Sequence, residues 1–157
     1  MNLSDHFTLE EATYSETAVR QGIDNQPSPA QLDNMKRAAA QLEAVRSLTG
    51  PLRVNSWLRL PGVNVAVGGS RTSSHMDGWA IDCSSTKHTP YELCQMVLKA
   101  GIKFDQLIHE YGRWMHISFA PAMRQQALTI FKPESKDRKS TRLNSSHSQQ
   151  SRMPSSA

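Results

Sequence analysis

The sequence predicts an α+β fold in which a small, mostly antiparallel sheet packs against helices. Helix signals with capping residues alternate with short segments whose apolar residues follow the period of a strand. The last two strand segments flank a three-residue turn, which indicates a hairpin. At 157 residues, the chain has the length of one domain with a substantial core.

The helices are predicted from their caps. Ser28 and Gln31 form a capping box, and apolar residues then recur at three- and four-residue steps until Gly50. This long helix is the expected scaffold of the domain. Shorter helices are expected after the cap Thr8, over residues 15–20, and from the cap Thr89 to Gly101.

Strands are expected between these helices, where apolar residues alternate or form short runs. Their predicted ranges are residues 52–56, 79–83, 104–110 and 114–120. Between the first two strands we expect a turn at Leu60-Pro-Gly, one helical turn over residues 64–67, and a polar loop over residues 70–77.

Charge and hydropathy argue against several classes of protein. Up to residue 132 there are 13 Lys and Arg against 12 Asp and Glu, so the net charge of +4 comes mainly from the C-terminal segment. A nearly neutral body argues against nucleic-acid binding. No apolar run is long enough to span a membrane, and the N-terminus lacks the pattern of a signal peptide. We expect a monomer that is synthesised in the cytoplasm and has no membrane partner.

The segment over residues 134–157 has a different composition from the rest. It is rich in Ser, Lys and Arg and poor in large apolar residues, so we expect it to be disordered. Part of it resembles a translated adaptor sequence that is not native to the protein. We therefore place the domain at residues 1–133 and give His147 no functional weight.

The two cysteines, Cys83 and Cys94, have no CxxC spacing. Synthesis in the cytoplasm disfavours a disulfide, so we expect two buried free thiols. A bridge or zinc ligation by these thiols is the alternative.

Three residues have the types and spacing of a metal site. In Ser73-Ser-His75-Met-Asp-Gly78-Trp-Ala80-Ile-Asp82, a polar loop supplies His75 and a short strand supplies Asp82. On the last predicted strand, His116 faces away from Met115 and Ile117. Imidazole nitrogens and carboxylate oxygens suit Zn²⁺, and three protein ligands leave a fourth position for water, as in catalytic zinc sites.

These motifs together resemble those of the zinc D-Ala-D-Ala peptidases. That family includes carboxypeptidases, dipeptidases, phage endolysins and the hedgehog signalling domain, which shares the fold. The likeness extends over residues 3 to about 120 and also includes Ser56-Trp-Leu-Arg59, Ala66-Val-Gly-Gly69 and Phe104-Asp-Gln-Leu-Ile108. It implies a hedgehog/DD-peptidase-like fold, and a Zn²⁺ ion held by His75, Asp82 and His116.

The resemblance also implies roles for residues around the metal. Arg59 aligns with an arginine that contacts the substrate near the scissile carbonyl. Many relatives carry Glu three residues before the last ligand, where this chain has Arg113. Glu110 is therefore the expected general base, and Asp77 is the second candidate. The residues expected to bind substrate are Arg59, Ser73 and Trp114.

The implied function is zinc-dependent hydrolysis of peptide bonds in peptidoglycan stem peptides. The enzyme is then a D-Ala-D-Ala carboxypeptidase or an endolysin-type endopeptidase, acting at the bacterial cell wall during phage lysis or from a virion. Arg113 at the usual acidic position keeps a second hypothesis open, a non-catalytic zinc-containing module that binds cell-wall peptide or a partner protein. A virion structural component with a vestigial site is the third.

Overall fold

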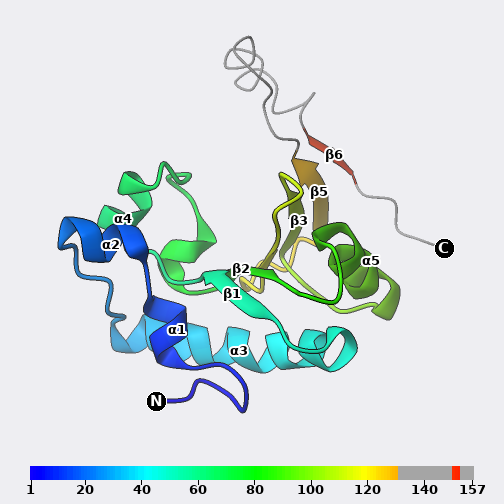
Figure 1. Cartoon of the computed structure of the whole chain (residues 1–157), viewed down its shortest axis with the longest axis horizontal. Coiled ribbons are helices and arrows are strands. Elements are labelled where there is room, and N and C mark those ends of the chain that lie inside the picture. Colours follow the sequence, from blue (N-terminus) through cyan, green and yellow to red (C-terminus); the bar gives the residue numbers. More distant parts are fainter. Residues whose placement is uncertain (131–149, 153–157) are drawn as a thin grey trace, which may run out of the picture.

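The computed structural model describes residues 1–130 and 150–152, and it shows helices packed around one sheet (Figure 1). The helices are α1 (Leu9–Thr13), α2 (Glu16–Gln21), α3 (Pro29–Thr49), α4 (Pro61–Ala66), the 3₁₀ helix η1 (Ser74–Asp77) and α5 (Pro90–Ala100). The strands are β1 (Arg53–Ser56), β2 (Ala80–Ser84), β3 (Gln106–Glu110), β4 (Trp114–Ser118), β5 (Gln126–Ile130) and β6 (Gln150–Arg152). The expected disorder of residues 134–157 concerns residues outside the described part, apart from the three that form β6.

The strands form one sheet in the order β1-β2-β4-β3-β5-β6. Neighbouring strands are antiparallel except β3 and β5, which pair in parallel. The predicted hairpin is formed by β3 and β4, with Glu110 opposite Trp114. Tyr111 and Gly112 in its turn have φ values of 56° and 69°, the left-handed conformation that tight hairpin turns use. The predicted α+β class with a mostly antiparallel sheet is confirmed.

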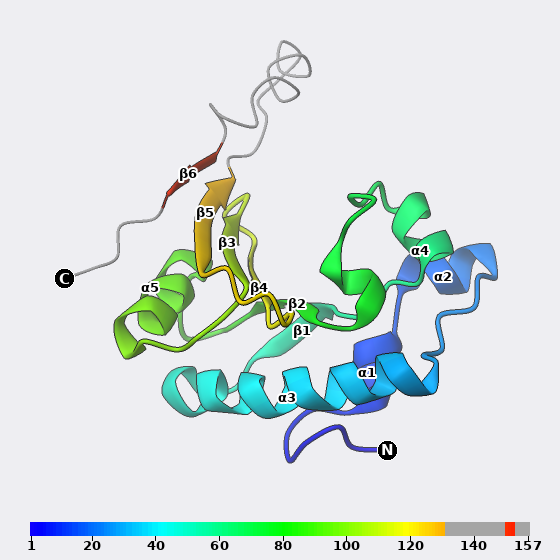
Figure 2. The same ribbon diagram turned by 180° about the vertical axis from the view of Figure 1, so that it is seen from behind.

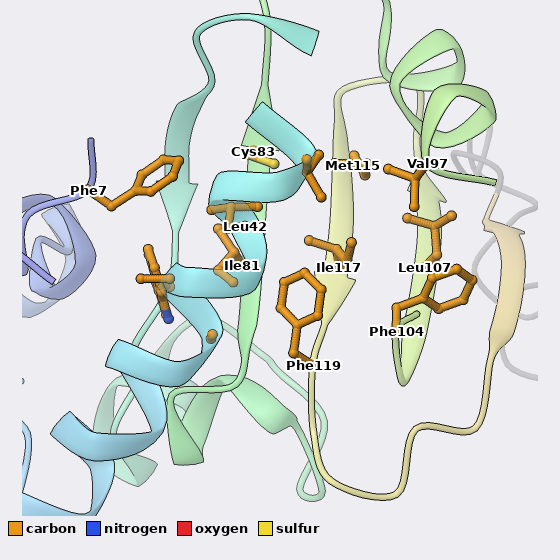
Figure 3. Packing of buried hydrophobic residues seen from close by; sticks show 14 of the residues in the cluster. Phe7, Leu42, Ile81, Cys83, Val97, Phe104, Leu107, Met115, Ile117 and Phe119 are labelled. Atoms are coloured by element: carbon orange, nitrogen blue, oxygen red, sulfur yellow. The ribbon is translucent and has the colours of Figure 1, made fainter. Parts of the chain in front are cut away.

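The apolar core lies between the sheet and the helices α3 and α5 (Figures 1 and 2). From β2 and β4, Ile81, Cys83, Met115 and Ile117 point into this layer and pack near Leu42 of α3 (Figure 3). All five side chains are fully buried. Because side chains alternate along a strand, the residues between them face the opposite side of the sheet.

The N-terminal half of α3 also holds η1, which lies at the end of the expected polar loop. Gln31 and Asn34 donate side-chain amide hydrogen bonds to the backbone carbonyls of Met76 and Asp77, at 3.1 and 2.9 Å. Gly78 then ends η1 with a φ of 87°, a left-handed conformation that favours glycine. The position of η1 is therefore fixed by the long helix.

Most predicted elements are confirmed, with four differences among residues 1–130. The expected turn at Leu60-Pro-Gly is wrong, because Leu60 is the N-cap of α4 and Pro61 occupies its first position, where proline is favoured. The helical turn expected over residues 64–67 is the second half of that helix. The end of the expected polar loop is helical in η1, and β5 was not predicted. β5 forms by pairing with β3, a partner distant in sequence.

Cys83 and Cys94 are both buried and free, as expected. Burial raises the pKa of Cys94 to about 12 and raises that of Cys83 as well. Both thiols are therefore protonated at neutral pH. Among the described residues, no helix combines the length and the apolar character needed to cross a membrane.

Candidate metal centre

The sheet brings two of the three predicted ligands face to face. Asp82 on β2 pairs in register with His116 on β4, so both side chains project from the same face of the sheet. The Oδ1 atom of Asp82 lies 2.8 Å from Nδ1 of His116. The two side chains are nearly buried, with 7% and 11% of their surface exposed. The alternation predicted for β4 places His116 opposite the core, as expected.

The helix η1 supplies the third residue. His75 lies in its first turn, where the Ser73 hydroxyl caps the helix by accepting the backbone N–H of His75 at 3.2 Å. Nδ1 of the ring lies 2.7 Å from the backbone carbonyl of Trp57, and Nε2 lies 3.3 Å from Oδ1 of Asp82. The His75 and His116 rings meet edge to face at 5.1 Å. The three predicted ligands thus converge from the helix η1 and two adjacent strands.

The chemistry of this group fits a metal ion. A carbonyl oxygen only accepts, so Nδ1 of His75 must be the protonated nitrogen and Nε2 must carry the lone pair. Nε2 is buried and has no hydrogen-bond partner among the described residues. It faces a carboxylate oxygen of Asp82, which is also an acceptor. A cation between the two atoms would satisfy both acceptors. One ligand atom from each of His75, Asp82 and His116 lies within 4.8 Å of the others.

The electrostatics favour the protonation states that a metal needs at two of the three ligands. Burial lowers the pKa of His75 more than the charge of Asp82 raises it, which keeps the ring neutral. Burial would raise the pKa of Asp82, but the charge that His75 carries once it is protonated in acid, together with the hydrogen bond to His116, holds it well below its usual range. Burial lowers the pKa of His116, yet its hydrogen bond to Asp82 raises it above the ordinary value. Because a proton and a metal ion compete for the same ring nitrogen, metal binding at His116 is expected to depend on pH.

Arg59 lies beside this group, at the end of the segment that supplies the Trp57 carbonyl. Its backbone N–H donates to the carbonyl of His75 at 3.0 Å; its charge contributes to the lowered pKa of His75 and opposes the rise in the pKa of His116. Its side-chain Nε is buried without a hydrogen-bond partner in the described part of the chain. The guanidinium is thus close to the metal group and has at least one donor left for a ligand.

Asn25 fixes the backbone around this arginine. Its side-chain amide donates to the carbonyls of Thr13 and Leu58 at 2.8 and 2.9 Å, and its Oδ1 accepts the N–H of Leu60 at 2.9 Å. The side chain is buried, so these bonds are shielded from water. The sequence did not indicate this role.

Glu110 lies on the same face of the sheet as His116. It is opposite Trp114, two residues from His116 on β4, so Glu110 and His116 are diagonal neighbours. The negative charge of Glu110 contributes to raising the pKa of His116, which reflects their closeness. Oε1 of Glu110 accepts a hydrogen bond from Nε1 of Trp114 at 2.7 Å. The structure therefore brings the expected base to the metal group, in contact with Trp114.

The remaining candidates have local structural contacts. Ser73 caps η1 through the backbone N–H of His75, and the buried Ser118 accepts the backbone N–H of Ala120. The backbone carbonyl of Asp77 is bound by α3, while Arg113 is exposed at the hairpin turn. The acceptor for His75 is a backbone carbonyl, which no side-chain pattern in the sequence could reveal.

Two imidazoles and one carboxylate, buried and pre-arranged around a common point, could hold a metal ion and would leave a fourth position open, as in catalytic zinc sites. A comparison with protein-family models matches Peptidase M15 over residues 5–118. The chain belongs to this family of zinc-dependent, D-Ala-D-Ala carboxypeptidase-like metallopeptidases. The comparison with curated proteins gave no match.

Proposed function

We propose that this protein hydrolyses peptide bonds in peptidoglycan stem peptides, with a zinc ion held by His75, Asp82 and His116. The observation that carries the proposal is the Glu110 carboxylate, which lies diagonally beside His116 on the face of the sheet that bears the ligands. A metal group with an adjacent carboxylate has both a site for an electrophile and a proton acceptor. We place the activity at the bacterial cell wall, in phage lysis or on a virion.

The zinc ion, when bound, supplies a Lewis acid for the scissile carbonyl and lowers the pKa of a coordinated water from about 15.7 toward about 7. Glu110 accepts the proton of the attacking water and then passes it to the leaving amine. Arg59 directs its guanidinium at the substrate carboxylate or at the oxyanion that develops on the carbonyl, which matches its unpartnered Nε. Glu110 thus acts on the water and on the leaving nitrogen, whereas Arg59 acts on an oxygen of the substrate.

The product of the reaction distinguishes a D-Ala-D-Ala carboxypeptidase from an endopeptidase. Purified sacculi digested by the zinc-loaded protein release free D-Ala in the first case and shorter or uncrosslinked stem peptides in the second. Mass spectrometry of the soluble fraction separates the two. Treatment with a chelator is expected to stop release, and zinc is expected to restore it.

The variant Glu110→Gln tests the general base. We expect it to bind zinc as the wild type does, and to lose a factor of about 10²–10⁴ in kcat. Glu16→Gln is the matched control, because Glu16 lies on α2 with 77% of its side chain exposed and, within the described part of the chain, pairs only with Arg20. A wild-type protein that binds zinc and sacculi but releases nothing would support a binding module instead. A wild-type protein without zinc would support a vestigial site.

A further inference from the structure

The indole of Trp114 makes a contact that a substrate-binding role does not explain. Its Nε1–H donates to Oε1 of Glu110 at 2.7 Å, a short charge-assisted hydrogen bond across the β3–β4 hairpin. Trp114 is half-buried, so this bond is partly shielded from water. An indole is a donor only, and it does not titrate near neutral pH, so it can orient the carboxylate without exchanging a proton with it.

The backbone of Glu110 is also held. Its carbonyl accepts the N–H of Arg113 at 3.0 Å, which closes the hairpin turn. The next residue, Tyr111, donates its backbone N–H to Ile130 of β5 at 2.9 Å. The Tyr111 ring packs edge to face on Trp114, with centroids 6.5 Å apart and planes at 90°. Backbone and carboxylate of Glu110 are therefore both fixed, the latter through Trp114.

We propose that Trp114 is a positioning residue, which holds one oxygen of Glu110 and so presents the other to the water that attacks the substrate. This inference rests on the proposed function, since it assumes that Glu110 is the base. A glutamate side chain has several rotatable bonds, and a hydrogen bond to one oxygen removes most of that freedom before substrate arrives. We expect pre-arrangement of this kind to affect the chemical step, because none of the hydrogen bonds described above for the metal ligands and Arg59 involves the indole.

The variant Trp114→Phe removes the donor and keeps an aromatic ring against Tyr111. We expect kcat to fall about ten- to a hundredfold while KM and zinc content stay within about twofold of wild type. Trp79→Phe is the matched control. Trp79 packs against the core, and no hydrogen bond joins its indole to a carboxylate among the described residues, so kcat is expected to stay close to wild type.

A double-mutant cycle with Glu110→Gln separates positioning from a general structural effect. If the indole acts through the carboxylate, Trp114→Phe produces no further loss of kcat in the Glu110→Gln background. The inference is overturned if Trp114→Phe keeps full kcat, if it raises KM alone, or if its effect is equally large in both backgrounds. The failure of the proposed function looks different, because wild-type protein loaded with zinc would then release no peptide at all.

Discussion

Gly78 is the residue at which the segment carrying His75 touches the long helix, and its replacement by alanine tests how that segment is positioned. A Cβ atom at this position would lie 2.6 Å from Cγ of Met35 and 3.1 Å from the backbone carbonyl of Gln31. Met35 is fully buried, and a helix carbonyl cannot move without the rest of the helix, so displacing either neighbour would cost free energy. The variant must therefore push η1 away from α3.

The cost has two parts. The left-handed backbone of Gly78, with φ at 87°, is unfavourable for alanine by about 1–2 kcal/mol. Overpacking against a filled core adds about 1–3 kcal/mol. We therefore expect Gly78→Ala to lower the free energy of unfolding by about 2–5 kcal/mol and, because His75 moves with η1, to weaken zinc binding as well.

Gly101→Ala is the control for the backbone part alone. Gly101 ends α5 with φ at 70°, and a Cβ atom at this position would have no neighbour within 4 Å. Urea unfolding of the two apo variants isolates the packing cost, and competition with a chelating dye measures zinc affinity. Equal losses of stability in both variants, with unchanged zinc affinity in Gly78→Ala, would refute the reasoning.

Two further variants and one labelling experiment test other parts of the structure. Asn25→Ala removes the side-chain partner of three backbone groups, and we expect it to lower the free energy of unfolding by about 2–4 kcal/mol in urea. We also expect a lower kcat/KM, because the segment that carries Arg59 would shift. A loss of stability below about 1 kcal/mol would contradict this. The side-chain hydrogen bonds from Arg124 lower the pKa of Asp105 in the folded protein. The ionised carboxylate therefore stabilises the fold at any pH above its unfolded pKa of about 3.9. This stabilisation is lost as the pH falls through the lower pKa of the folded state. Asp105→Asn is expected to cost about 1.5–3 kcal/mol at pH 7 and progressively less in acid, in unfolding curves recorded from pH 7 to pH 3. Cys83 and Cys94 are expected to react with a thiol reagent at pH 8 only after unfolding, and rapid labelling of the native protein would contradict their burial.

The elements that the sequence predicted well are those encoded by local contacts. The capping boxes of α3 and α5 join residues three positions apart, Ser28 with Gln31 and Thr89 with Glu92, and both form as expected. The same holds for His116, whose orientation follows from the alternation of β4 alone. Each of these features depends on neighbours in the chain.

The features that the sequence did not reveal depend on contacts between distant segments. The strand β5 has little alternation of its own and exists because β3 offers a parallel partner. The carbonyl of Trp57 that orients His75 is a backbone group, and every residue has one. Asn25 likewise binds only backbone groups of other segments, so its residue type alone carries no sign of the role.

The ligands are divided between two parts of the fold, and this has a consequence for stability. Asp82 and His116 belong to the sheet, while His75 belongs to a segment anchored on α3 by Gln31 and Asn34. An ion shared by all three residues would join the helical layer to the strands much as a crosslink does. At free zinc concentrations above Kd, the melting temperature would then rise in proportion to the logarithm of the zinc concentration. In a metal-poor compartment the protein would therefore be less stable as well as inactive.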